Sequence, residues 1–137
     1  RLKPAISLDG FNVLSTVDTD NTAYKRMYGT SMAAPGVAGA ITLLSQRYKE
    51  VNSANPRVDT IKAIIFNTAK DIENIGPDFK SGFGQLDALK AIKVIDSMDR
   101  SNSLVKLDNI RKNEHQKYRI NSTDYQDFKV TLAWVDE

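Results

Sequence analysis

The chain has 137 residues, 41% of them hydrophobic, which is enough for one domain with a sizeable core. Its 19 basic and 17 acidic side chains leave a net charge of +2 with no block of like charge, so electrostatics indicates neither a nucleic-acid partner nor a membrane surface. No apolar run approaches the roughly 20 residues that span a bilayer. The absence of Cys excludes disulfides and thiolate ligands, and the single histidine, His115, excludes a histidine-rich metal site.

The N-terminal part of the chain combines extended segments with a long helical pattern. Residues 2–8 and 12–17 are rich in branched side chains and flank Asp9-Gly10, which predicts two extended stretches around a turn, followed by a polar loop over 18–28. From Ser31 to about Lys49, apolar residues recur at three- and four-residue spacing, which is typical of a helix. Small and apolar residues also surround this stripe, so we expect a mostly buried helix.

Two further helices are predicted before the composition changes. Asn55-Pro56 is typical of an N-cap with Pro in the first turn, and the helix that it opens is expected to end near residues 67–69. A turn-rich loop follows over 71–84. Asp87 is then the expected cap of a third helix that ends by Met98.

The polar residues 99–103 are interpreted as a linker between a domain part at 1–98 and a second part at 104–137. Beyond the linker the period becomes two, because Phe128, Val130, Leu132 and Trp134 alternate with smaller or polar residues, and residues 118–120 offer a second strand. Two or three strands alone leave long edges unpaired. Residues 104–137 are therefore expected to be the start of a truncated β-sandwich-like domain. Since Arg1 is neither an initiator Met nor part of a signal peptide, we expect the chain to be an internal piece of a longer protein.

The turn Gly29-Thr30-Ser31, directly before the long helix, has two interpretations. In one, Thr30 or Ser31 caps the helix through its hydroxyl, which is the commoner use of such residues. In the other, Ser31 is a nucleophile, which needs a general base, a group that orients this base and donors for an oxyanion. A helix start supplies unpaired N–H groups for the last of these tasks. The nucleophile elbow G-x-S-x-G is excluded because Ala33 occupies the position of its second Gly.

The residues around this turn also resemble a known family. Residues 29–35 read G-T-S-M-A-A-P and are continued by V-A-G-A at 37–40, which resembles the active-site serine signature of the subtilisin-like serine proteases, the subtilases. Residues 3–7 and 12–16 are similar to the segment K-P-D-I-x-A-P-G-x-x-I-x-S that precedes this serine. Further along, residues 58–70 and 82–88 resemble the helix, loop and final helix that complete the catalytic domain. Residues 128–136 are similar to a strand of the β-sandwich domain that follows it in some larger subtilases.

The sequence departs from the family pattern in three places. Ala5 occupies a position that is usually acidic, and Leu8-Asp9-Gly10 replaces the usual A-P-G. Gly36 stands where many members have a His that is not the catalytic base.

The resemblance implies an α/β fold, namely the C-terminal portion of a doubly wound parallel-sheet subtilase domain followed by an incomplete antiparallel β segment. It implies that Ser31 is the nucleophile and a backbone oxyanion donor, and that Gly29, Thr30 and Met32 lie near the substrate. Met32 could equally be a core-filling residue. No cofactor is expected in this chain, whereas calcium is possible in the parent protein by resemblance. The family also implies a polypeptide substrate and an extracellular or cell-envelope location.

The rest of a subtilase site is missing from the residues before Ser31. In the family the triad Asp and His and the oxyanion Asn all precede the serine, yet the first 30 residues contain no His, and Asp9, Asp18 and Asp20 lack the D-[ST]-G setting. His115 belongs to a charged run and is expected to be a solvated loop residue. We therefore expect a serine endopeptidase whose 137-residue piece needs the upstream part of the catalytic domain and is inactive alone. The alternative is a non-catalytic subtilase-like scaffold or peptide-binding protein.

Overall fold

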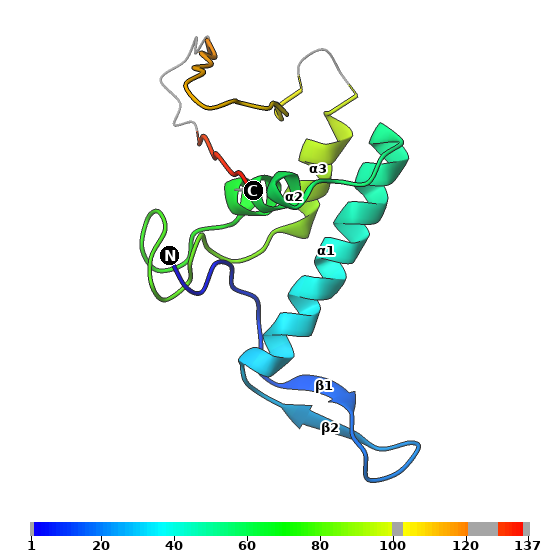
Figure 1. The fold of residues 1–137 in the computed structure, drawn as a ribbon. Helices are drawn as coiled ribbons and strands as arrows, with labels where there is room; N and C mark the ends of the chain where they lie inside the picture. The colour runs from blue at the N-terminus through cyan, green and yellow to red at the C-terminus, as the bar shows by residue number, and fades with distance from the viewer. Residues whose placement is uncertain (1, 100–102, 121–128, 136–137) are drawn as a thin grey trace.

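The computed structural model describes residues 2–99, 103–120 and 129–135 (Figure 1). A hairpin comes first, formed by β1 (Val13–Thr16) and β2 (Tyr24–Met27), which pair antiparallel from Val13 opposite Met27 to Thr16 opposite Tyr24. Strand β1 lies in a segment predicted to be extended. The prediction of a polar loop over 18–28 is wrong for β2, because pairing with β1 makes a strand of the polar run that ends at Met27.

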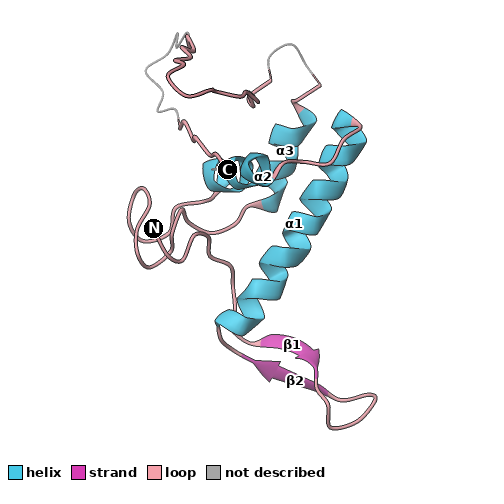
Figure 2. Cartoon of the chain, viewed as in Figure 1, coloured by secondary structure: helices cyan, strands magenta, loops and turns pink. Residues whose placement is uncertain are grey.

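Helix α1 (Thr30–Asn52) is the long helix that the apolar spacing predicts. Within it only Leu44 and Tyr48 are buried, so the expectation of a mostly buried helix is wrong for the described structure. Figure 2 shows the reason: the other two helices lie along the C-terminal half of α1, while its N-terminal half extends toward the hairpin. In that half, Gly36 leaves room for the side chain of Leu8, since a Cβ there would lie 2.6 Å from Leu8 Cδ2.

The core is formed where α2 (Val58–Thr68) and α3 (Ala88–Asp96) pack against α1. The prediction of Asp87 as the cap of α3 is confirmed, because its Oδ1 accepts a hydrogen bond of 2.9 Å from Lys90 N–H. The prediction of Asn55 as the cap of α2 is wrong: Arg57 is the N-cap and makes no side-chain cap bond. The buried hydrophobic cluster contains Leu44, Tyr48, Ile61, Ile64, Ile65, Leu86, Ala91 and Ile95.

Three extended segments meet beside these helices. Gln85 pairs with Ser7 in parallel and with Lys70 in antiparallel, through backbone hydrogen bonds of 2.8–2.9 Å. Gly82 allows the segment before Gln85 to pass close to the backbone of Ala5. Its φ of +69° suits glycine, and a Cβ there would lie 2.5 Å from Ala5 O. Within residues 2–8 only Ser7 makes a bridge, so the predicted extended stretch does not form a regular strand. In the described ranges this bridge is the one parallel pairing, and the doubly wound sheet stays a prediction.

The C-terminal residues have no regular strand in the two ranges that the structure describes, 103–120 and 129–135. The strand predicted at 118–120 is therefore not formed. The strand predicted at 128–134 is not formed over 129–134, and residue 128 lies outside the described residues. Along 129–135 burial does alternate, but Thr131 and Ala133 are half-buried while Leu132 and Trp134 are 80% and 65% exposed. The large side chains of this segment therefore do not form a core, because no second sheet covers them among the described residues.

Other predictions on the organisation of the chain stay open. Residues 100–102 of the predicted linker lie outside the described residues, so the domain boundary stays a prediction. None of the helices in the described ranges is long and apolar enough to cross a membrane.

Candidate active site

Ser31 is the second residue of α1, and a glycine precedes the helix. Gly29 is the N-cap, with φ 139° and ψ 169°, and no side chain caps the helix. The positive φ lies in a region that favours glycine. The interpretation of Thr30 or Ser31 as the cap is therefore wrong, since both residues lie inside the helix and the N-cap position needs a backbone that neither would adopt readily.

Main-chain contacts hold this turn in place. Gly29 N–H donates to Gly10 O at 2.9 Å, and a Cβ on Gly10 would lie only 2.5 Å from Gly29 O. Gly29 O in turn accepts hydrogen bonds from the N–H groups of Met32 and Ala33, at 3.0 and 3.3 Å. The segment before β1 and the start of α1 therefore touch through their backbones, and two glycines make this contact possible.

The main chain of Ser31 takes little part in the helical hydrogen-bond ladder. The N–H groups of Thr30 and Ser31 have no acceptor among the described residues. Pro35 stands four residues after Ser31 and has no N–H, so the Ser31 carbonyl lacks its usual helical donor. A free N–H at a helix start is the kind of donor that stabilises an oxyanion.

The hydroxyl of Ser31 is exposed and has no hydrogen-bond partner in the part of the chain that the structure describes. His115 belongs to the segment 103–120, which lies at the end of the molecule opposite the start of α1 (Figure 1). The side chain of His115 is itself exposed. Within the described residues, therefore, neither His115 nor another base reaches Ser31.

The other predicted site residues surround the same turn. Thr30 is exposed, whereas Met32 is half-buried and its Sδ lies 3.8 Å from the position that a Cβ on Gly29 would take. Met32 is not a member of the buried core cluster. The structure thus brings Gly29, Thr30, Ser31 and Met32 together at one helix start, while their roles toward a substrate stay predictions.

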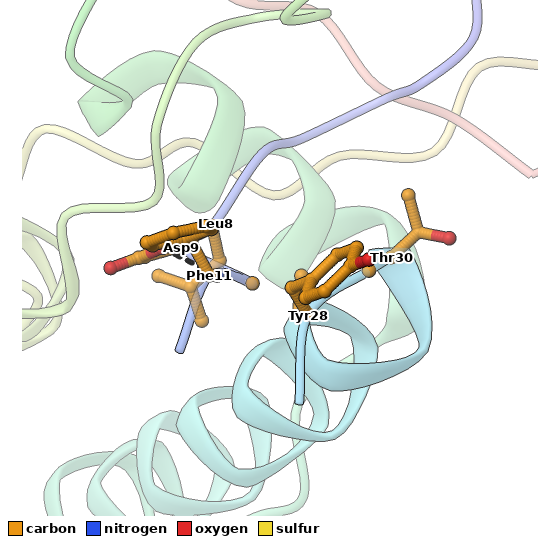
Figure 3. A pocket seen from close by; sticks show the side chains of 8 residues that line it. Leu8, Asp9, Phe11, Tyr28 and Thr30 are labelled. Atoms are coloured by element: carbon orange, nitrogen blue, oxygen red, sulfur yellow. Dashed lines mark hydrogen bonds between the residues drawn. The ribbon is translucent and has the colours of Figure 1, made fainter. Parts of the chain in front are cut away.

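An open pocket of about 380 Å³ lies next to this turn. Figure 3 shows the rings of Phe11 and Tyr28 at its sides, and their centroids are 6.3 Å apart. Asp9 Oδ1 accepts a hydrogen bond of 2.8 Å from Phe11 N–H, which fixes the pocket rim. Neither ring is predicted from the sequence as part of the site. One sequence feature could have indicated them: Phe11 directly follows Gly10 and Tyr28 directly precedes Gly29, the two glycines in backbone contact.

A metal ion would need several ligands grouped in one place. No group of three or more His, Cys, Asp or Glu side chains that could hold a metal ion occurs in the described ranges. Calcium in the parent protein stays a prediction.

Comparisons with known proteins agree on one class. The model of the subtilase family, peptidase S8, matches residues 1–84, which is more than half of the chain. The chain therefore belongs to the subtilase family.

Individual relatives differ in how much of each chain is covered. The minor extracellular protease Vpr of Bacillus subtilis is 35% identical over 102 residues, which is 67% of this chain and 12% of that protein. The C5a peptidase of Streptococcus pyogenes is 31% identical over 120 residues, 80% of this chain and 10% of that protein. A solved structure of a lanthipeptide protease has a TM-score of 0.50 and 35% identity, over 52% of this chain and 21% of that one. The chain thus spans about a tenth of the length of these curated relatives.

Proposed function

We propose that this chain supplies the nucleophile of a serine endopeptidase and that Ser31 is this residue. The observation that carries the proposal is the position of Ser31: it is exposed at the start of α1, next to its own unpaired N–H, within a motif that the subtilase family model covers. Names of the matched relatives support a protease, since they include the minor extracellular protease Vpr and the C5a peptidase.

The proposed reaction follows from these groups. Ser31 Oγ attacks the carbonyl carbon of a peptide bond and passes its proton to a general base, and the negative oxygen that forms accepts a hydrogen bond from Ser31 N–H. When this intermediate collapses, the carbon–nitrogen bond breaks, the protonated base gives its proton to the leaving nitrogen, and an acyl-enzyme remains on Ser31. Water, deprotonated by the same base, then releases the acid and restores the serine.

We propose that the base and the carboxylate that orients it come from outside residues 1–137. No His precedes Ser31, and the segment with His115 lies far from the start of α1. The finer fold expected for the complete catalytic domain, a doubly wound parallel sheet, belongs to this proposal, as does a β-sandwich-like domain that starts within residues 104–137. An extracellular or envelope location is supported by the names of Vpr and of the autotransporter lipoprotein NalP of Neisseria meningitidis, which is 41% identical over 64 residues, 47% of this chain and 6% of that protein.

A fluorophosphonate probe tests the proposal in two arms. In the 137-residue chain, we expect Ser31 to be labelled no faster than an ordinary exposed serine such as Ser15, because no base activates it. In the parent protein, we expect rapid labelling and peptide hydrolysis, and Ser31→Ala lowers kcat by roughly a millionfold, the cost of losing the serine in a subtilisin. Ser15→Ala is the control and leaves the rate unchanged. A parent protein that is folded yet neither labels nor cleaves would instead favour the non-catalytic scaffold.

A further inference from the structure

The end of α2 holds residues 129–135 through one side chain. Asn67 Nδ2 donates to the backbone carbonyl of Lys129 at 2.9 Å and to Thr131 Oγ1 at 3.1 Å. One amide group therefore contacts a main-chain carbonyl and, two residues later, a side-chain hydroxyl.

The start of α2 holds the other C-terminal segment in a similar way. The guanidinium of Arg57, the N-cap, is fixed by the buried carboxylate of Asp59, with Nη2–Oδ2 at 2.6 Å and Nε–Oδ1 at 3.1 Å. Its remaining Nη1 donates to Asn109 Oδ1 at 3.1 Å. Since Asp59 belongs to α2, the orientation of the Arg57 guanidinium is set by α2 itself.

Packing contributes little between these two anchors. Phe66 and Phe83 stack on each other with centroids 4.3 Å apart, yet a cavity of about 830 Å³ separates this pair from residues 129–133. Leu132, which lines the cavity, is 80% exposed. Because the segment is not packed into the core, its position depends on directional hydrogen bonds.

We propose that α2 is a docking surface for the C-terminal region of this chain, with Asn67 and Arg57 as its two anchor points. The partner that it fits is a segment that presents a main-chain carbonyl and, two residues later, a hydroxyl. Docking at both ends of one helix fixes the C-terminal region relative to α1 and Ser31, so this region is held in one orientation rather than tethered by a free linker. The inference does not depend on the reactivity of Ser31.

Energy transfer from Trp134, the single tryptophan, measures docking directly. The chain has no cysteine, so Leu43→Cys on the exposed side of α1 carries the acceptor dye. In this background we expect one narrow distribution of distances. Asn67→Ala removes both bonds and raises the undocked population by roughly five- to thirtyfold, which broadens the distribution. Thr131→Val removes only the hydroxyl acceptor and gives a smaller change.

The matched control is Thr131→Ser, which keeps the hydroxyl and is expected to keep the narrow distribution. Circular dichroism at 222 nm checks that α1, α2 and α3 remain folded. If Asn67→Ala lowers this signal, the pair Thr131→Val and Thr131→Ser decides the question, because both substitutions lie outside the helices. The proposal would be overturned if Asn67→Ala and Thr131→Val both gave the same distance distribution as the labelled chain without these substitutions, with the helical signal intact.

Discussion

The helical part and the C-terminal segments use their apolar side chains very differently. In the helical part, three helices give their apolar faces to one cluster, and Leu44, Ala91 and Ile95 have no exposed surface. Along 103–120 and 129–135, large apolar residues such as Leu104 and Leu132 remain 75% and 80% exposed. The first region is stabilised by burial. The second makes a few directional bonds to α2, and its Val105 packs against the edge of the core cluster. The difference shows that an apolar pattern specifies structure only where another element is present to cover it.

Truncating one leucine in each region gives the largest contrast. Leu44→Ala leaves a cavity in the core and is expected to lower the free energy of unfolding by about 2–5 kcal/mol. Leu132→Ala removes an exposed side chain and is expected to change it by less than about 0.5 kcal/mol. Chemical denaturation followed by helical circular dichroism measures both. Equal losses would mean that residues 129–135 share the core of the helical part.

Glycine substitutions sharpen the comparison within the helical part. An alanine at Gly82 is strained by its φ of +69° and meets Ala5 O at 2.5 Å, so Gly82→Ala is expected to cost about 1–3 kcal/mol or more. Gly39, inside α1, has open space at the position that a Cβ would take. Gly39→Ala is therefore expected to stabilise the helix by about 0.5–1 kcal/mol, measured by the same denaturation. A loss of stability at Gly39 would show that the exposed half of α1 is covered in solution.

The smallest expected effect is a dependence of stability on acid. Hydrogen bonds from Arg57 lower the pKa of Asp59, and backbone N–H groups of Ser81 and Lys80 lower that of Asp78. Because these folded-state pKa values lie below the unfolded value of about 3.9, the stabilisation is complete above that pH and is lost as pH falls through the lowered values. Denaturation midpoints measured from pH 7 down to about pH 2 follow the loss. Asp59→Asn is expected to reduce this acid-dependent loss while the part due to Asp78 remains, and an unchanged pH profile would contradict the role of Asp59.

Local signals predict most of the helical part. The apolar spacing after Ser31 and the capping oxygen of Asp87 act over one or two turns, so they can be recognised without knowing the fold. Strand β2 is missed because its residues are polar and become a strand only through pairing with β1. The bridge between Ser7 and Gln85 joins two residues far apart in the sequence, and no local pattern indicates it.

The candidate site divides in the same way. The motif around Ser31 can be recognised in the sequence because its residues are contiguous, while the roles of Ser31 and Gly29 toward a substrate stay predictions. The pocket between Phe11 and Tyr28 is missed, since it exists only because Gly10 and Gly29 bring two separate segments into backbone contact. The anchors Arg57 and Asn67 are missed for a related reason: their partners lie 52 and 64 residues further along the chain.

The position of Ser31 outside the helical ladder also bears on the energy of reorganisation. Its N–H has no acceptor in the described residues, and Pro35 gives its carbonyl no helical donor. In the proposed reaction, a developing negative charge would therefore accept a hydrogen bond from Ser31 N–H without breaking any existing bond. The rest of α1 would not need to adjust when this charge appears or disappears.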